Sequence, residues 1–297
     1  MNIRFILNPH SGKLKGDADK IASMASAIQL NFPGADMRLT KAPGHATELA
    51  QEAARAGFDA AVAIGGDGTI NETARGLAGT DTALGVIPNG SGNGFARELG
   101  MPLLFEEAVA RLQRAQKMKC DAGRANGELF LNLAGVGIEA DIAWQFMEQG
   151  KTGRRGMWPY FKIGAKTAFT YKPHTLDVDF DGRRETVAPL TLVFANGRQY
   201  GSNFKIAPRA SLTDGELDMV AVQDAPKWKL ALAAPAFFTD NWRPFGITQT
   251  TRVKHALIRQ PGEIVYHVDG EPRKTRDTLE IAVDEFMSVY NGDKYTG

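Results

Sequence analysis

The sequence has one cysteine, almost no net charge and no long apolar run. The single Cys120 excludes an internal disulfide and is typical of a reducing compartment, so we expect a cytoplasmic protein. A formal net charge of +1 over 297 residues excludes a strongly electrostatic partner and argues against nucleic acid. The most apolar later stretch, Leu230 to Phe238, is about half the length of a transmembrane helix and contains a proline. We therefore expect any membrane contact to be peripheral, and the first residues predict no signal peptide.

The composition that remains is typical of a globular protein, with 43% hydrophobic and 23% charged residues. At roughly 150 residues per domain, this length predicts two domains, and the pattern of elements changes near residue 123. Before it, strand-like and helix-like segments alternate, which favours an α/β domain with a mostly parallel sheet. Strands are predicted at residues 3–7, 36–39, 60–64 and 83–87, and helices at 17–30, 44–56, 71–77, 92–99 and 104–115.

After about residue 123, short strand-like runs predict a second, mainly antiparallel β-rich domain. The last residues of the chain could pack back on the first domain. Asp181-Gly182, Asp214-Gly215 and Asp269-Gly270 are typical hairpin turns between such strands. Strands are predicted at 129–133, 176–180, 190–194, 217–222, 253–258, 264–268 and 279–283, with helices near 138–148, 159–170 and 226–234.

Small polar residues and glycines follow each predicted strand of the first domain. These loops are Asn8 to Lys13, Thr40, Gly65 to Thr69, and Pro88 to Gly94. In an open parallel sheet, ligands bind beyond the carboxyl ends of the strands. If the strands are parallel neighbours, the loops share one edge of the sheet, and the sequence predicts a binding site there.

The loop Gly65-Gly66-Asp67-Gly68-Thr69 is typical of phosphate binding except for its charge. Backbone N–H groups of a glycine loop bind phosphate without a lysine, but a carboxylate repels it. The repulsion disappears when a divalent cation lies between the two groups. Mg²⁺ prefers oxygen ligands and can be held by one carboxylate together with nucleotide phosphates. We therefore predict that Asp67 lies on the metal side of a phosphoryl-transfer site.

Five motifs in this order carry a resemblance to a known family: NPHSGK from Asn8, GGDGTINE from Gly65, IPNGSGNGFAR from Ile87, KIAPRASLTDGELD from Lys205 and HVDGEP from His267. The chain resembles the diacylglycerol kinase catalytic-domain family, which also contains sphingosine kinases and bacterial lipid kinases. The GGDGT element is shared with NAD kinases. The resemblance implies an ATP- and Mg²⁺-dependent lipid kinase of phospholipid biosynthesis. It implies a nucleotide-binding domain at residues 1–123, a lipid-substrate domain at residues 124–297, and an active site in the cleft between them.

The resemblance also implies a role for particular residues. Glu271 is the implied catalytic base, acting with Asp67. A structural Mg²⁺ is implied near Ser211, Asp214 and Glu216, where Ser211 and Glu216 contribute backbone oxygens. The implied nucleotide contacts are His10, Ser11, Gly12, Lys13, Thr40, Gly65, Gly66, Asp67, Gly68, Thr69, Ile70, Asn71 and Ser91.

Two positions complicate this assignment. Gly94 stands where family members often have an aspartate, so one carboxylate of the metal network is missing. Asp121 matches another acidic position of the family and could share that role, although a turn aspartate at the domain junction is the other interpretation.

Three functions stay open at this point. The first is a lipid kinase, and the second is an NAD kinase that phosphorylates a ribose hydroxyl. The third is a non-catalytic lipid-binding regulator, which Gly94 favours and which the retention of Asp67 and Glu271 argues against. The basic, aromatic segment Gly150–Lys172 is either a solvated helix or a surface for anionic lipid. The sequence does not name the lipid or the oligomeric state.

Overall fold

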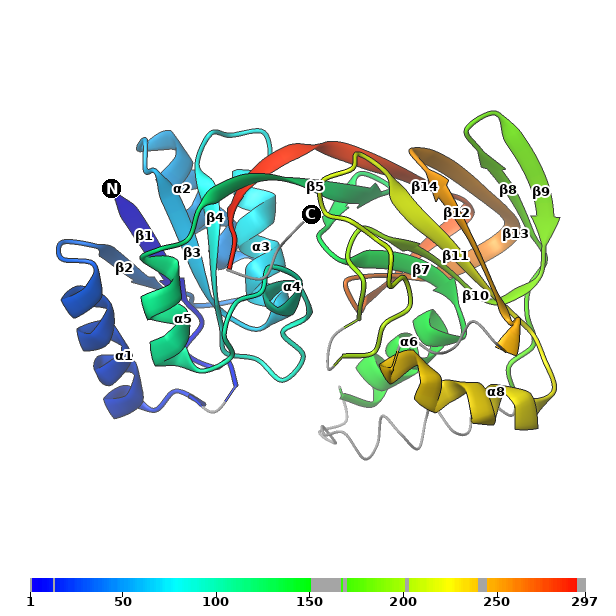
Figure 1. Ribbon diagram of the computed structural model, residues 1–297, viewed down its shortest axis with the longest axis horizontal. Coiled ribbons are helices and arrows are strands. Elements are labelled where there is room, and N and C mark those ends of the chain that lie inside the picture. Colours follow the sequence, from blue (N-terminus) through cyan, green and yellow to red (C-terminus); the bar gives the residue numbers. More distant parts are fainter. Residues whose placement is uncertain are drawn as a thin grey trace. The chain divides into compact units, whose positions relative to one another are not determined.

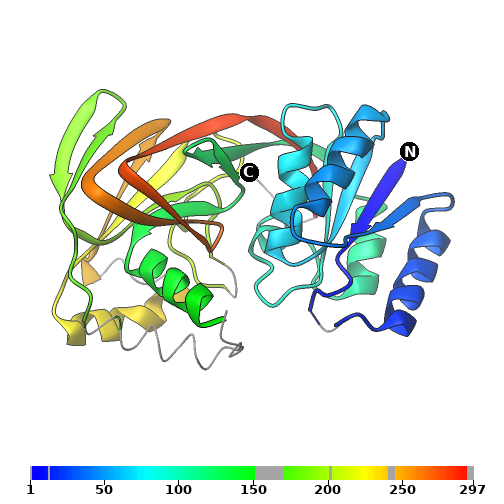
Figure 2. The ribbon, with the colours of Figure 1, turned by 180° about the vertical axis from the view of Figure 1, so that it is seen from behind.

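The computed structural model describes residues 2–12, 14–150, 167, 170–200, 203–239 and 245–292. The chain forms two compact units (Figure 1, Figure 2). The first unit comprises Met1–Asp121 together with Glu285–Gly297, and the second comprises Ala122–Asp284. The division falls within two strands, β5 (Lys117–Ala125) and β14 (Glu271–Tyr290). Each unit is described separately below.

The first unit is built on a parallel sheet, as predicted. Its strands run in the order β4-β3-β1-β2, and all neighbouring pairs are parallel. The end of β14 adds to this sheet, where Val289 pairs with Leu84 of β4 in parallel. The four strands are β1 (Ile3–Leu7), β2 (Asp36–Leu39), β3 (Ala60–Gly65) and β4 (Ala83–Pro88).

Helices cover both faces of this sheet, which is why β1, β3 and β4 are wholly buried and, apart from Arg4 in β1, consist of apolar residues and glycine. One face carries α1 (Ala18–Asn31) and α5 (Phe105–Leu112), and the other carries α2 (His45–Arg55) and α3 (Asp67–Leu77) (Figure 1, Figure 2). A short helix, α4 (Gly94–Glu98), follows β4. The helix predicted from residue 71 begins at Asp67, because the glycine loop itself forms the first turn of α3. Glycine has low helix propensity and hides that turn from the sequence pattern.

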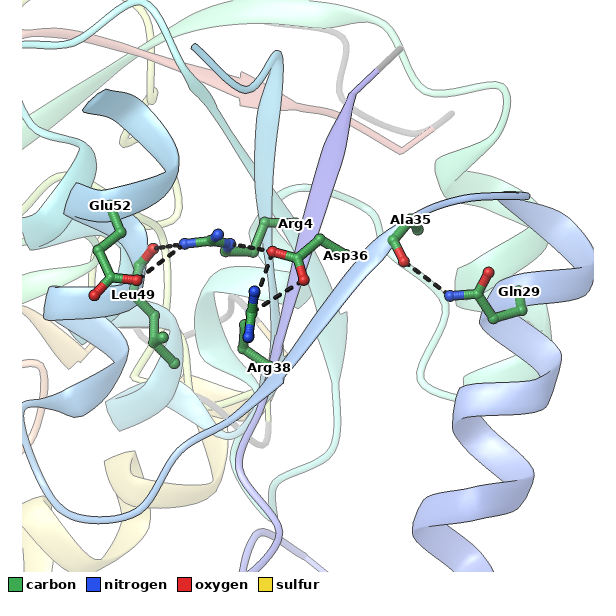
Figure 3. A network of polar contacts seen from close by, with 7 residues as sticks. All are labelled: Arg4, Gln29, Ala35, Asp36, Arg38, Leu49 and Glu52. Atoms are coloured by element: carbon green, nitrogen blue, oxygen red, sulfur yellow. Dashed lines mark hydrogen bonds and ion pairs between the residues drawn. The ribbon is translucent and has the colours of Figure 1, made fainter. Parts of the chain in front are cut away.

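A buried arginine holds the edge of this sheet together (Figure 3). Arg4 of β1 donates from Nε to Asp36 Oδ2 of β2 at 2.7 Å. Its Nη1 reaches the carbonyl oxygen of Leu49 at 3.1 Å and Glu52 Oε2 at 3.3 Å, both on α2. Because a buried charge is stable only when it is paired, these contacts fix β1, β2 and α2 relative to one another.

The second unit is a predominantly antiparallel sheet, as predicted, with the strand order β12-β11-β10-β7-β13-β14. The strand β8 pairs with β13 and with β9, and β6 pairs with β5. The strands are β6 (Glu128–Phe130), β7 (Leu133–Gly137), β8 (Leu176–Phe180), β9 (Arg183–Val187), β10 (Pro189–Ala195), β11 (Leu217–Gln223), β12 (Thr248–Val253) and β13 (His255–Val268).

Two predicted strands of this unit were wrong in their boundaries. The run 129–133 spans the end of β6 and the start of β7, and the run 253–258 spans the end of β12 and the start of β13. In both places the chain changes direction inside an apolar stretch. Local composition gives only a weak turn signal there, since neither bend contains glycine or proline and Asn132 is the one turn-forming residue.

Strand β10 is buried on both faces. Leu192 and Phe194 belong to one apolar cluster, whereas Val193 and Ala195 belong to another on the opposite face. The second cluster is covered by helices, which lie on the same side of the sheet in Figures 1 and 2. These are α6 (Ile138–Gly150), α8 (Lys227–Ala233) and the 3₁₀-helix η1 (Ala234–Phe238). In the part of the chain that the structure describes, no helix combines the length and apolar character needed to cross a bilayer.

Two of the three predicted hairpin turns are confirmed. Asp181-Gly182 joins β8 to β9 and Asp269-Gly270 joins β13 to β14, with positive φ at all four residues, as a type I′ turn requires. The hairpin predicted at Asp214-Gly215 is wrong. That pair lies just before β11, whose antiparallel neighbour β10 ends at residue 195, far earlier in the chain.

The turn before β14 is anchored to the start of β7. Asp269 Oδ2 accepts the N–H of Leu131 at 2.8 Å, and its Oδ1 accepts those of Asn132 and Leu133 at 2.9 and 3.0 Å. We expect Asp269→Ala to lower the free energy of unfolding by roughly 2–4 kcal/mol, since partly buried donors lose a charged acceptor. Urea denaturation measures the change. The control is Asp181→Ala, because Asp181 has the same turn type but is exposed, so that water can replace its carboxylate. An equal loss of unfolding free energy in both variants would contradict the prediction.

Candidate active site

The predicted loops of the first unit meet at the carboxyl edge of its sheet. Asn8 Nδ2, after β1, donates to Thr69 Oγ1, after β3, at 3.1 Å. Asn89 Nδ2, after β4, donates to Ser11 Oγ at 2.9 Å. The N–H of Thr40, directly after β2, donates to the carbonyl of Leu7 in β1 at 2.9 Å. Four segments that are far apart in the sequence therefore form one continuous surface.

Glycines permit this close approach. A Cβ atom on Gly12 would lie 2.3 Å from the carbonyl oxygen of Asn89, and φ at Gly12 is +53°. A Cβ atom on Gly90 would lie 2.5 Å from the Cα of Gly66. Real Cβ atoms do not approach backbone atoms so closely. The loops after β1, β3 and β4 consequently pack backbone against backbone, and a larger residue at either glycine would push them apart.

The N-terminus of α3 lies at this surface. Its N-cap residue is Gly66, which makes no side-chain cap. The first N–H groups of a helix have no partner within the helix, and with the helix dipole they favour an anion. The N–H groups at Asp67, Gly68 and Thr69 are therefore suited to phosphate oxygens, without any lysine.

Asp67 faces the loop after β4. Its Oδ1 accepts a long hydrogen bond, 3.4 Å, from the N–H of Phe95 at the start of α4. Burial raises the pKa of Asp67, and the N–H groups of Phe95, Gly94 and Asn93 only partly oppose that change. A partly buried carboxylate that accepts such a long hydrogen bond is incompletely compensated, so a divalent cation fits this position. Gly94 contributes a backbone N–H to the surroundings of Asp67.

The other predicted nucleotide contacts differ in their accessibility. His10 and Ser91 are exposed and Thr40 is half-buried at the same edge. Asn71 is buried in α3. The side chain of Ile70 is fully buried and its N–H bonds the carbonyl of Gly66 within the helix, so Ile70 lies behind the loop. Lys13 lies outside the described residues.

Glu271, the predicted base, is the first residue of β14 in the second unit. Its side chain is about half exposed, and Oε2 accepts a hydrogen bond from Arg273 Nη2 at 2.8 Å. Arg273 also binds both carboxylate oxygens of Glu128, at 2.8 and 2.9 Å. Hydrogen bonding to Glu128, and then to Glu271, raises the pKa of Arg273, so the guanidinium remains charged.

The predicted structural metal position contains an arginine. Arg252 Nη1 lies 3.9 Å from Asp214 Oδ2 and 3.6 Å from Glu216 Oε2. Burial, together with the charges of Asp214 and Glu216, raises the pKa of Asp218 to about 6. Over the described ranges, no three His, Cys, Asp or Glu side chains are arranged to hold a metal. A magnesium ion at this turn would need backbone oxygens, such as that of Ser211, and stays a prediction.

Asp121 is buried in β5 rather than placed in a turn, so its interpretation as a turn aspartate was wrong. The segment Gly150–Lys172, predicted as either a solvated helix or a lipid surface, lies largely outside the described residues.

The second unit contains an apolar cavity of about 410 Å³ that sequence reasoning missed. It lies between β10, α6, α8 and η1, and its apolar lining includes Ile138, Leu190, Ile206, Val222, Leu230 and Phe237. Lining residues come from six separate segments, so no local motif marks the cavity. The apolar stretch at Leu230 to Phe238 is the one signal that could have suggested it, because it is too short for a membrane and too apolar for a solvated helix.

One end of this cavity carries a buried polar pair. Glu139 lines the cavity, and its Oε1 lies 3.7 Å from His267 Nε2, which is too far for a hydrogen bond. Counting only residues that the structure describes, neither carboxylate oxygen of Glu139 nor His267 Nε2 has a hydrogen-bond partner. His267 Nδ1 accepts the N–H of Gly270 at 3.4 Å. The polar end of the cavity is thereby linked to the turn that precedes Glu271.

Comparison with known proteins gives matches over nearly the whole chain. Residues 2–125 match the family of the diacylglycerol kinase catalytic domain. Residues 134–286 match the YegS C-terminal NAD kinase beta sandwich-like domain. A diacylglycerol kinase from Mycobacterium tuberculosis is 32% identical over 280 residues, which cover 90% of this chain and 87% of that protein. A diacylglycerol kinase from Bacillus subtilis is 32% identical over 225 residues, covering 75% of this chain and 74% of that protein.

A solved structure shares the fold. The crystal structure of a diacylglycerol kinase from Bacillus anthracis superposes with a TM-score of 0.73 and 23% identity. The match covers 98% of this chain and 97% of that one. At this identity the likeness concerns the fold alone, and it agrees with an α/β unit followed by an antiparallel β-rich unit.

The raised pKa of Asp67 predicts how its charge affects stability. Because folding makes Asp67 harder to ionise, its charge destabilises the folded protein above the raised pKa. We expect Asp67→Asn to melt a few degrees higher than the wild type at neutral pH, without nucleotide or divalent cation. The difference should shrink as the pH falls through the raised pKa toward the ordinary value of 3.8.

The matched control is Asp17→Asn at the N-cap of α1. A hydrogen bond with Lys20 lowers the pKa of Asp17, so its charge acts in the opposite direction. This variant should be no more stable than the wild type at neutral pH. A melting temperature of Asp67→Asn at or below that of the wild type would show that the charge is already compensated.

Proposed function

Because the chain belongs to the family of the diacylglycerol kinase catalytic domain and is a lipid kinase, we propose that it transfers the γ-phosphate of Mg²⁺-bound ATP to a primary hydroxyl of a lipid. Diacylglycerol and sphingoid bases are the candidate acceptors. The observation that carries the choice of acceptor is the apolar cavity in the second unit, whose lining includes the carboxylate of Glu139. A molecule with apolar chains and a small polar head group has the matching distribution of polarity.

The nucleotide site of the proposal is the loop surface of the first unit. Its phosphates accept hydrogen bonds from the N–H groups at the start of α3, and the dipole of that helix favours their charge. Asp67 holds the Mg²⁺ ion, whose bound form neutralises negative charge on the phosphates during transfer. The poorly compensated carboxylate of Asp67 supports this role.

Glu271 is the proposed general base. As the oxygen of the lipid hydroxyl forms its bond to the γ-phosphorus, the bond between that phosphorus and the leaving oxygen of ADP breaks. The hydroxyl proton passes to the carboxylate of Glu271. Arg273 contacts Oε2, so we assign the proton to Oε1 while the ion pair keeps the side chain oriented.

The cavity also separates this proposal from the two alternatives. An NAD kinase requires a polar pocket for a nucleoside, whereas this lining is almost entirely apolar. A non-catalytic lipid-binding protein has no use for a buried, weakly compensated aspartate at the glycine loops. Asp67 therefore supports a catalytic protein.

The decisive experiment measures ATP turnover against diacylglycerol, sphingosine and NAD, each with Mg²⁺ and with a chelator. The proposal expects Mg²⁺-dependent phosphorylation of one of the lipids and none of NAD. Phosphorylation of NAD would identify an NAD kinase. ATP or lipid binding without turnover of any acceptor would identify the regulator.

Glu271→Gln tests the base. Glutamine keeps the shape and the contact with Arg273 but cannot accept the proton, so kcat should fall by about 10²–10⁴-fold, with ATP affinity nearly unchanged. The matched control is Glu128→Gln, which removes the other carboxylate bound to Arg273. It should change kcat by less than about tenfold, as expected for a partly exposed ion pair. Equal losses in both variants would assign Glu271 to the ion-pair network and move the base elsewhere.

A further inference from the structure

The helices α8 and η1 expose a stripe of apolar side chains. Trp228 is 67% exposed, Leu232 is 61% exposed and Phe238 is 47% exposed, and Pro235 lies exposed between the last two. Trp228 and Leu232 are four residues apart on an α-helix and share one face. Leu232, Pro235 and Phe238 follow at intervals of three, which the 3₁₀ geometry of η1 keeps in line. The four side chains consequently form one continuous strip.

The opposite side of the same segment closes the apolar cavity. Leu230 and Phe237 line the cavity and pack into the apolar cluster beneath it. Ala231 and Ala234 line the cavity as well, yet both are exposed to solvent. The cavity is therefore accessible to solvent at α8 and η1, on the segment that carries the exposed strip.

The charge around the strip is positive. From Ala225 to Thr239 the sequence has two lysines, Lys227 and Lys229, and no acidic residue. Lys227 lies 3.8 Å from Asp224, whereas Lys229 has no carboxylate within ion-pair distance among the residues that the structure describes. Lysine stems lie along apolar surface while their ammonium groups reach outward to water or lipid head groups.

We propose that α8 and η1 form the surface by which this protein docks on an anionic lipid bilayer. The strip formed by Trp228, Leu232, Pro235 and Phe238 enters the boundary between head groups and acyl chains, and Lys227 and Lys229 contact anionic head groups. Tryptophan at such a boundary has its apolar ring in lipid and its N–H in the polar layer.

The position of the cavity favours a bilayer over a protein partner as the occupant of the exposed strip. The proposed acceptor, on which this inference rests, is a lipid. If it left the bilayer through the aqueous phase, its apolar chains would be exposed to water. With the opening of the cavity beside the docked strip, those chains pass from bilayer to cavity without contacting water. A protein partner bound at the strip would instead cover the opening.

The test is binding to vesicles of phosphatidylcholine with and without phosphatidylglycerol, measured by co-sedimentation. The variant is Trp228→Glu with Leu232→Glu, two exposed positions at which the fold loses little. The control is Leu30→Glu with Leu104→Glu, which makes the same change in net charge at leucines that are 82% and 62% exposed in the first unit. Thermal melting checks that both proteins are folded.

We expect wild type and control to bind vesicles that contain phosphatidylglycerol, and the variant to bind them about tenfold or more weakly. The variant should retain wild-type turnover of a short-chain lipid alcohol dissolved as monomers and lose turnover on vesicles. Because sedimentation does not require catalysis, failure of the kinase proposal would appear separately, as absent turnover in every protein.

Two results would overturn the docking surface. Equal vesicle binding by variant and control would place membrane contact elsewhere. A change of oligomeric state in the variant, with vesicle binding unchanged, would identify the strip as an interface between copies of this chain.

Discussion

The first unit depends on how closely three loop backbones approach one another at one edge of its sheet. Gly12 lies against the carbonyl of Asn89, and Gly66 lies against Gly90, where no Cβ atom fits. That contact fixes the start of α3, whose N–H groups then point at one place without the help of a lysine. The proposed phosphate site consists of backbone dipoles, and Asp67 adds a negative charge beside them. A carboxylate beside phosphate requires a divalent cation between them, which is why the proposed function pairs Asp67 with Mg²⁺.

In the second unit, the sheet forms a solid apolar core on one face and a core with a cavity on the other. Alternating residues of β10 and β11 enter two separate apolar clusters, so both faces are dry. One cluster is closed by strands alone, whereas the other is closed by α6, α8 and η1, which leave a cavity between them. Asp269 then attaches the hairpin that carries Glu271 to the start of β7. The cavity and the proposed base both belong to the second unit.

Buried charges in this protein fall into two kinds. Arg4 is fully paired with Asp36 and with groups on α2, and its role is structural. Asp67 and Glu139, by contrast, are poorly compensated at the positions where ligand contacts are proposed. Leaving a buried carboxylate without donors lowers stability unless something else supplies them. Such sites are therefore candidates for binding a cation or a polar head group. Arg4, whose charge is fully paired within the protein, is the contrasting case in the same fold.

The sequence alone determined the two-part architecture, the shared edge of the glycine loops and the hairpin at Asp269-Gly270. Each depends on a local pattern, namely the alternation of strands and helices or a turn pair with positive φ. Only the tertiary structure decided that Asp214-Gly215 is not a hairpin turn and that Arg252 lies beside the carboxylates of Asp214 and Glu216. It also decided that Ile70 lies behind the glycine loop and that the apolar stretch near Leu230 closes a cavity. These features arise from contacts between residues far apart in the chain. Such contacts leave no period in the sequence, because any apolar residue can face a cavity or a solid core, and only the packing of distant segments determines which it is.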